Sequence, residues 1–144
     1  MALRKRTAEL ALALSLVIVG VAALGAAAAD ATTGKLTIAP TGYHDQYSLT
    51  VSGDYLTYTP YGVDVAVRLW GDDEWFDDLL FTPFGTTYAN SWPGHFERQF
   101  TVPGSTLNED WGADEIYADA RLYDHSTGKL IQTIETNRLY GNWS

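Results

Sequence analysis

The chain has 144 residues, a formal net charge of −9 at pH 7 and no cysteine. Without cysteine it can form no disulfide, no thiol nucleophile and no Cys-ligated metal cluster. The acidic balance disfavours binding to the phosphates of nucleic acids or of anionic membranes. It is compatible with cations, with basic proteins or simply with solubility.

The first 29 residues have the order of a secretory signal peptide. Basic residues 4–6 precede an uncharged apolar stretch at residues 10–24, and its alanine-rich end permits cleavage after Ala29 or after Ala31. The alternative is an uncleaved anchor, because a bilayer needs only about 17–25 apolar residues. The weakly apolar alanines argue against anchoring. We therefore expect a secreted, extracellular protein with no membrane attachment after cleavage.

Residues 30–144 are predicted to form one domain after the signal peptide at residues 1–29. Removal of the signal takes three of the nine basic residues but only one of the eighteen acidic ones, so the remainder stays acidic. A domain of this length can bury a core without disulfides. It is rich in Tyr, Trp, Phe, Val and Thr, which favour strands over helices.

Apolar and polar residues alternate in six segments of this domain, which is the pattern of half-buried strands. In chain order, the segments are residues 36–38, 47–52, 63–70, 96–102, 116–123 and 130–136. Turn signals rich in proline and glycine separate them. Six or seven short strands of this kind predict an all-β fold, a single antiparallel two-sheet sandwich.

Residues 114–128 resemble part of an immunoglobulin-like or fibronectin type III-like domain. The segment DEIYADARLYDHSTG is similar to a penultimate strand that opens with a tyrosine, here Tyr117, and turns through a hairpin into the last strand. In such domains this tyrosine commonly bonds back to the preceding loop. The usual cysteine pair is missing, and Trp70 lies on the strand face opposite the valines. The resemblance is to a widely shared fold and implies no activity.

The architecture would bring three acidic loops to one end of the sandwich, which we call the acidic pole. These loops lie near residues 41–45, 72–78 and 108–115. Crowded carboxylates repel one another unless a cation bridges them, and calcium accepts about 6–8 oxygen ligands in flexible geometry. We expect a weak calcium site here, with a solvated acidic rim as the alternative. The predicted ligands are Asp72, Asp73, Asp77, Asp78, Glu109, Asp110 and Asp114.

The other end, which we call the aromatic pole, would gather the loops near residues 54–62, 84–92 and 124–128. Aromatic rings on loops can stack on sugar faces or anchor a protein partner. The alternative is that these rings close the end of the core. The predicted ligand-binding residues are Tyr55, Tyr58, Tyr61, Tyr88 and Trp92.

Signals for catalysis are weak. The three histidines, His44, His95 and His125, fall in separate segments. Asp124, His125 and Ser126 contain the residue types of a catalytic triad, but neighbours in one turn do not provide its geometry. The sequence contains no nucleophile elbow, zinc-protease motif or phosphate-binding loop. We expect a non-enzymatic module that binds a protein or a glycan. The alternatives are a structural domain with calcium, or a small secreted hydrolase or enzyme inhibitor.

Overall fold

The computed structural model describes residues 34–73, 75–90, 93–108 and 113–143. The expected signal segment at residues 1–29 lies outside these residues. Within them, no residue belongs to a helix that could cross a membrane. The described elements are the strands β1 (Lys35–Pro40), β2 (Gln46–Tyr55), β3 (Val63–Gly71), β4 (Asp78–Phe81), β5 (Thr87–Ala89), β6 (Gly94–Pro103), β7 (Asp114–Asp124), β8 (Leu130–Glu135) and β9 (Leu139–Gly141), and a short 3₁₀ helix, η1 (Gly104–Thr106).

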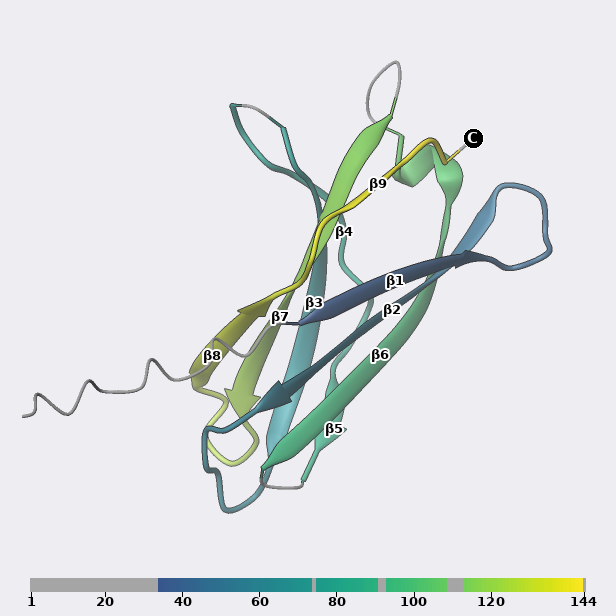
Figure 1. Cartoon of the computed structure of the whole chain (residues 1–144). Helices are drawn as coiled ribbons and strands as arrows, with labels where there is room; N and C mark the ends of the chain where they lie inside the picture. Colours follow the sequence, from purple (N-terminus) through teal and green to yellow (C-terminus); the bar gives the residue numbers. More distant parts are fainter. Residues whose placement is uncertain (1–33, 74, 91–92, 109–112, 144) are drawn as a thin grey trace, which may run out of the picture.

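The strands form two antiparallel sheets, which confirms the predicted all-β, two-sheet fold. One sheet has the order β1-β2-β6 and the other has β4-β3-β7-β8, with β5 also paired to β3 and β9 also paired to β7. Figure 1 shows the first sheet crossing in front of the second. β4 and β5 pair with opposite ends of β3, so together they form one interrupted edge. β8 and β9 divide β7 in the same way.

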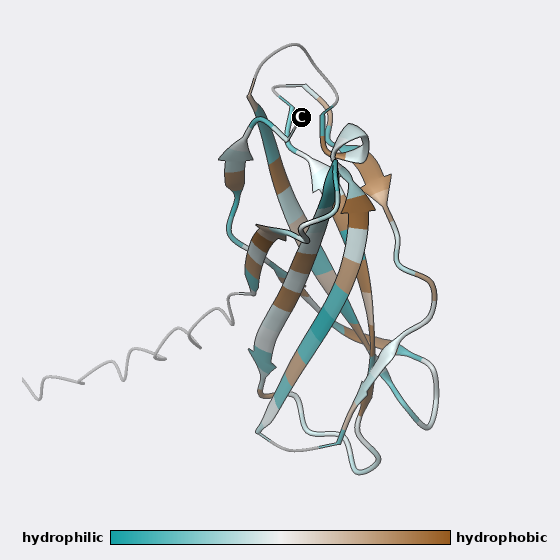
Figure 2. Ribbon diagram, turned by 90° about the vertical axis from the view of Figure 1, so that its right-hand side faces the viewer, coloured by the Kyte–Doolittle hydropathy of each residue, from teal (hydrophilic) through white to brown (hydrophobic). Residues whose placement is uncertain are grey.

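The core lies between the two sheets and follows from the alternation of apolar residues. In β3, every second residue from Val63 to Gly71 is buried, and hydrophobic and hydrophilic bands alternate along the strands in Figure 2. The inner face of β7 presents the smaller Ala118 and Ala120. From the first sheet, Leu49 and Phe96 are among the residues that complete the cluster.

Tyr55 is part of this core, and its prediction as a ligand-binding residue is wrong. Its side chain is 1% exposed. Gly94 lies directly opposite it in the β2–β6 ladder, and a Cβ at Gly94 would overlap the Tyr55 ring. The ring therefore folds over the glycine and into the interior. Burial, with a smaller contribution from Tyr88, raises the pKa of the Tyr55 hydroxyl.

β9 returns the end of the described chain to the core. Trp143 is buried, its ring meets Tyr47 edge-to-face with centroids 6.0 Å apart, and its backbone N–H donates to the Asn108 side-chain oxygen over 3.0 Å. The side-chain hydrogen bond that the structure describes for Tyr117 runs to a different loop from the one before its strand. Its hydroxyl donates to Asp77 Oδ2, in the β3–β4 loop, over 2.7 Å.

Side chains bridge the places where edge strands are interrupted. Between β8 and β9, the Thr136 hydroxyl accepts the Ala118 N–H over 2.9 Å. Asn137 bonds through its side chain to both backbone groups of Leu36, at 2.9 and 3.4 Å, and so occupies the edge of β1 at this residue. On the other side of the sandwich, Arg98 on β6 donates to the carbonyl of Phe84 between β4 and β5.

The strand directions group the loops at two ends, as the sequence predicted. At the acidic pole, Gly104 N–H donates to Asp45 O over 3.0 Å, which joins two of its loops. At the aromatic pole, His125 N–H donates to Gly62 O over 3.1 Å and joins the β2–β3 loop to the β7–β8 hairpin. The candidate sites therefore stand on loops that strands hold in place.

Candidate functional site

Three of the five predicted aromatic residues are exposed at the aromatic pole. The side chains of Tyr58, Tyr61 and Tyr88 are 67%, 63% and 50% exposed. Tyr55 is buried, as described above, and Trp92 lies outside the described residues. The exposed rings come from two segments, the β2–β3 loop and β5, so their arrangement depends on how these segments are held together.

Gly62 holds the β2–β3 loop against its neighbours. The loop turns at Pro60 and Tyr61, and Gly62 follows with a φ of 81°. Only glycine adopts this left-handed region without strain. A Cβ at Gly62 would also overlap the Ala89 carbonyl of β5. The close approach brings Tyr61 to the end of β5, next to Tyr88.

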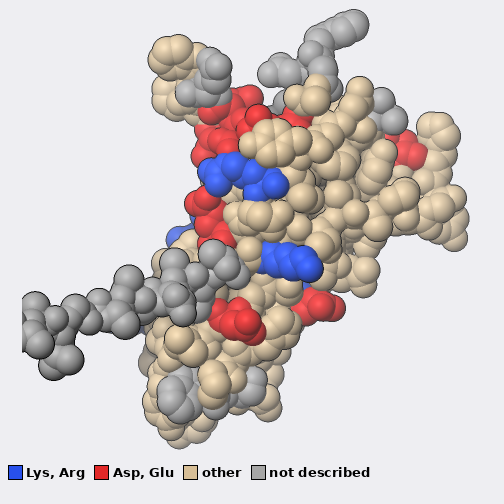
Figure 3. Space-filling view, viewed as in Figure 1, with Lys and Arg blue, Asp and Glu red and all other residues tan. Residues whose placement is uncertain are grey.

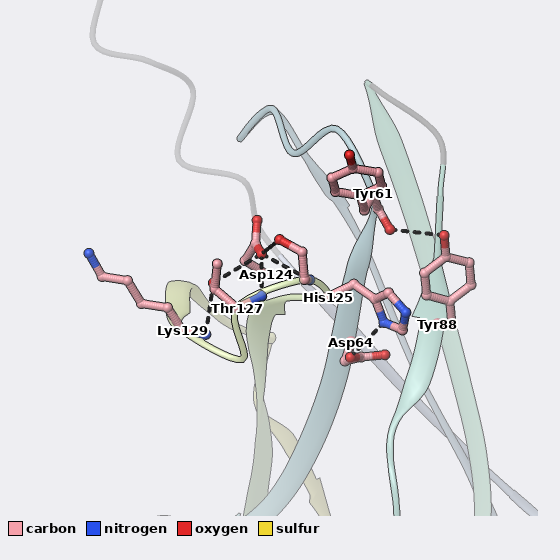
Figure 4. Close-up of polar contacts among 8 residues, drawn as sticks. Tyr61, Asp64, Tyr88, Asp124, His125, Thr127 and Lys129 are labelled. Carbon is pink, nitrogen blue, oxygen red and sulfur yellow. Dashed lines mark hydrogen bonds and ion pairs between the residues drawn. The ribbon is translucent and has the colours of Figure 1, made fainter.

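Tyr88 is fixed in position although half of its surface is open to solvent. Its hydroxyl donates to the Tyr61 carbonyl over 2.9 Å. Its ring packs edge-on against the imidazole of His125, with centroids 4.8 Å apart and an interplanar angle of 61°. Figure 4 shows Tyr88 and His125 side by side, with Tyr61 above them. An aromatic ring restrained at both its edge and its hydroxyl loses little conformational entropy on binding.

His125 is oriented by Asp64. Its Nδ1 lies 2.9 Å from Asp64 Oδ2. In the strand register, Asp64 on β3 stands between Tyr88 on β5 and Tyr123 on β7. The three side chains occupy adjacent positions on the outer face of the sheet, so a carboxylate lies between two tyrosines. We call Tyr61, Asp64, Tyr88 and His125 the Tyr88 cluster.

The β7–β8 hairpin that carries His125 is stabilised by Asp124. Its Oδ1 accepts bonds from the backbone N–H and hydroxyl groups of both Ser126 and Thr127, at 2.6 to 3.0 Å. These bonds, with the Ser126 hydroxyl foremost, lower the pKa of the Asp124 carboxyl. Ser126 thus donates directly to Asp124 while His125 turns to Asp64, and the three neighbours do not form a catalytic triad.

A second pair of the same kind lies at this pole, on the other sheet. His95 Nδ1 is 2.8 Å from Asp54 Oδ1, and these residues face each other across the β2–β6 ladder. Both side chains are exposed. The pole therefore presents imidazole and carboxylate groups on both sheets, in addition to its aromatic rings.

The predicted calcium ligands are not gathered in the part of the chain that the structure describes. Asp72 forms an ion pair with Arg138, and Asp77 accepts the Tyr117 hydroxyl. Glu109 and Asp110 lie outside the described residues. The others are Asp73 in the β3–β4 loop, Asp78 at the start of β4 and Asp114 at the start of β7. Among the described residues, no group of three or more His, Cys, Asp or Glu side chains could hold a metal ion.

Arginine and aromatic side chains cover the outer face of the larger sheet towards the acidic pole. Arg68 binds Asp119 through two nitrogens and lies 4.7 Å from the centre of the Trp70 ring. Arg138 lies 4.8 Å from the centre of the Tyr117 ring. On the face that Figure 3 shows, basic side chains lie next to acidic ones. Of the predicted calcium ligands, Asp72 is thus paired with an arginine within the protein.

Sequence reasoning missed Asp64 and the role of His125. Asp64 was identified only as the polar partner of a valine in a strand. The available signal was its position at the start of that strand, directly after the Pro60–Gly62 turn. Its partner His125, however, is distant in the sequence. The contact between Tyr88 and His125 depends on β5, a strand of three residues that alternation does not detect.

Comparisons with known proteins show no family. No family model and no curated protein matches the chain. Among solved structures, the chain is similar to a Bordetella pertussis protein crystallised under the name ApaA, with 13% identity. That match covers 76% of this chain and 89% of the other, at a TM-score of 0.39.

Proposed function

We propose that this protein is a secreted, non-enzymatic binding module that recognises a neutral glycan through the aromatic pole. The observation that carries the proposal is the restraint of Tyr88, half exposed yet held by the Tyr61 carbonyl and the His125 ring. A fixed, exposed ring is suited to stack on the apolar face of a sugar. Secretion rests on the order of residues in the first 29 positions.

The groups around Tyr88 favour a glycan over a protein partner. Asp64 and His125 lie beside its ring, and Asp54 and His95 lie on the neighbouring sheet. Carboxylates accept strong hydrogen bonds from hydroxyl groups, and sugars present hydroxyls around an apolar ring face. The chain's net charge of −9 disfavours acidic polysaccharides.

The strand order supports an immunoglobulin-like or fibronectin type III-like architecture. The order β1-β2-β6 against β4-β3-β7-β8 corresponds to strands A-B-E against C′-C-F-G of such a sandwich. Loops at one end of this architecture commonly carry binding residues, because the sheets hold them rigidly. The aromatic pole is such an end.

The proposal is tested by isothermal titration calorimetry with cellohexaose, xylohexaose and chitohexaose. The protein is expressed from the full chain and purified in the form that the cell produces. We expect one of these sugars to bind, and both Tyr88→Ala and Tyr61→Ala to weaken binding at least about tenfold, which corresponds to about 1.4 kcal/mol. Tyr43→Ala is the matched control. Tyr43 is also highly exposed, but it lies in the β1–β2 loop at the other end.

Absence of binding by all three sugars at about 1 mM, or equal binding by the wild type and both pole variants, would overturn the proposal. A purified protein partner that binds the wild type and not Tyr88→Ala would replace the glycan with a protein ligand. The thermal midpoint of each variant is measured first, because a large fall would mean that the fold and not the contact has changed.

A further inference from the structure

The β3–β4 loop, residues 72–77, carries two adjacent exposed aromatic side chains at the opposite end of the molecule. Trp75 and Phe76 are each 83% exposed. Leu79, next along the chain on β4, is 52% exposed and lies on the outer face of the sheet, opposite Trp70. Large apolar side chains grouped in this way mark interaction sites more often than single exposed ones do. The Tyr88 cluster plays no part in this surface.

The base of this loop is fixed on both sides of its aromatic tip. Asp72 N–H donates to Glu115 O over 2.8 Å, and the Asp72 carboxylate forms an ion pair with Arg138. On the other side, Asp77 accepts the Tyr117 hydroxyl over 2.7 Å. Arg138 and Tyr117 also contact each other, with the guanidinium 4.8 Å from the ring centre. These contacts hold both ends of the loop while Trp75 and Phe76 extend into solvent.

The charge around the tip determines which partner fits. Figure 3 shows acidic side chains gathered beneath the end of this loop, with basic side chains below them. Asp73, Asp77 and Asp78 are exposed beside the aromatic pair. An anionic membrane surface would repel this charge, and so would a second copy of a chain with net charge −9. A basic surface would attract it.

We propose that Trp75 and Phe76 anchor this protein to a second protein, in an apolar pocket that Lys and Arg residues surround. Aromatic side chains at the centre of an interface commonly supply most of the binding energy. The acidic residues around them steer the encounter and increase the association rate. The fixed base reduces the entropy lost on binding. This interaction is independent of glycan recognition at the aromatic pole.

The experiment identifies the partner by its contact with the loop and then measures its affinity. A photo-crosslinking amino acid replaces Phe76 in the full chain in the producing cells, and the adduct is identified by mass spectrometry. The partner is purified, and its binding to the protein is measured as a function of salt. We expect Trp75→Ala to weaken binding about 30-fold. We expect Asp78→Asn to slow association and to reduce its salt dependence, with little change in dissociation.

Tyr43→Ala is the matched control, because Tyr43 is 80% exposed at the same pole on a different loop, and it should leave affinity unchanged. Failure to crosslink any protein would overturn the proposal, and so would a partner affinity that neither Trp75→Ala nor salt changes.

Two further measurements test other occupants of this surface. The first is binding to vesicles of phosphatidylcholine, with or without phosphatidylglycerol. If the protein binds these vesicles and Trp75→Ala abolishes the binding, the loop is a membrane-binding site and the proposal is overturned. The second is the oligomeric state, and a dimer that Trp75→Ala dissociates would assign the loop to self-association. Sugar binding in these variants should match the wild type, which separates this test from that of the aromatic pole.

Discussion

At the scale of single residues, whether a tyrosine in a strand is buried or exposed depends on the residue opposite it in the sheet. Tyr55 faces Gly94 across the β2–β6 ladder and folds inward over it. Phe96 lies over Gly53 in the same ladder, two residues further on. Tyr88 lies opposite Asp64 on the outer face of its sheet, where no such space is available and solvent is close. Residues of the same type therefore serve the core in one place and a binding surface in another.

Asp124 gives the protein a dependence on pH that can be measured. Its folded pKa lies below the usual value of 3.8 because Ser126 and Thr127 donate hydrogen bonds to its charged form. Such a group stabilises the fold above its unfolded pKa, and this contribution is lost as the pH falls through the folded pKa. Asp124→Asn keeps an acceptor but removes the charge. We expect the melting temperature of the wild type to exceed that of Asp124→Asn at neutral pH, and the difference to shrink in acid.

Thermal melts of both proteins from about pH 7 to about pH 2 test this expectation. Ser126→Ala removes the shortest of the bonds to Asp124, at 2.6 Å. In that variant the melting temperature should therefore fall less between neutral and acidic pH than it does in the wild type. A difference between the wild type and Asp124→Asn that is constant across the whole range would show that the charge of Asp124 does not contribute.

At the scale of strands, both edges of the larger sheet are interrupted, and side chains provide hydrogen bonds where the backbone ladder is broken. The chain leaves β7 after β8 and rejoins it as β9. At the gap, the Thr136 hydroxyl accepts the N–H of Ala118, and Thr136 N–H donates to the Ala118 carbonyl over 2.9 Å. Ala118 is fully buried, so without the hydroxyl its N–H would lack a partner.

Thr136→Val should therefore destabilise the protein although it keeps the shape of the side chain. Leaving a buried N–H without an acceptor costs about 1–3 kcal/mol. Urea unfolding followed by tryptophan fluorescence measures the change in free energy. Thr136→Ser keeps the hydroxyl and is the control, with a smaller loss. A loss in Thr136→Val no larger than that in Thr136→Ser would show that the hydroxyl contributes no more to stability than the methyl group that serine lacks.

At the scale of the whole molecule, the two ends of the sandwich are closed differently. At the aromatic pole, Tyr55 fills the space above Gly94. At the acidic pole, Trp143 packs against Tyr47, and its backbone N–H is held by the Asn108 side chain. The tryptophan lies almost at the end of the described chain, and yet it belongs to the same core as the valines of β3.

Trp143→Ala should be among the most damaging single changes in this protein. Removing a large buried aromatic side chain costs about 3–5 kcal/mol, against a total stability of about 5–15 kcal/mol for a domain. Chemical denaturation should show the loss as a lower midpoint. Trp143→Phe fills more of the space and should fold with a smaller loss. A loss below about 1 kcal/mol for the alanine variant would mean that the end of the chain does not contribute to the core.

The fold could be predicted from the sequence because its long strands each have one buried face. Alternation located β1, β2, β3, β6, β7 and β8. β5 and β9 have three residues each, too few for a period to be visible. All four residues of β4 retain exposure to solvent, so its pattern is not that of a half-buried strand. These three strands complete the edges of the larger sheet.

The candidate site was only partly predictable, because it depends on partners distant in the sequence. Tyr61 and Tyr88 were identified from their loop positions. The burial of Tyr55 could not be foreseen without knowing that Gly94 is its partner. Likewise, Asp72 looked like one carboxylate among many, because its ion pair with Arg138 joins segments far apart in the chain. Local patterns report which residues are aromatic or acidic, and the register decides which of them meet.

The bonds from Asn137 to Leu36 also bear on how the protein behaves in a crowded compartment. An outer strand with unpaired backbone groups can template pairing with another chain and start aggregation. Asn137 uses its amide to occupy both backbone groups of Leu36, and Gly34 N–H donates to the Glu135 carbonyl just before it. The start of this edge, at Leu36, is thus closed to strand exchange. A single asparagine side chain therefore acts as a safeguard against misassembly between molecules.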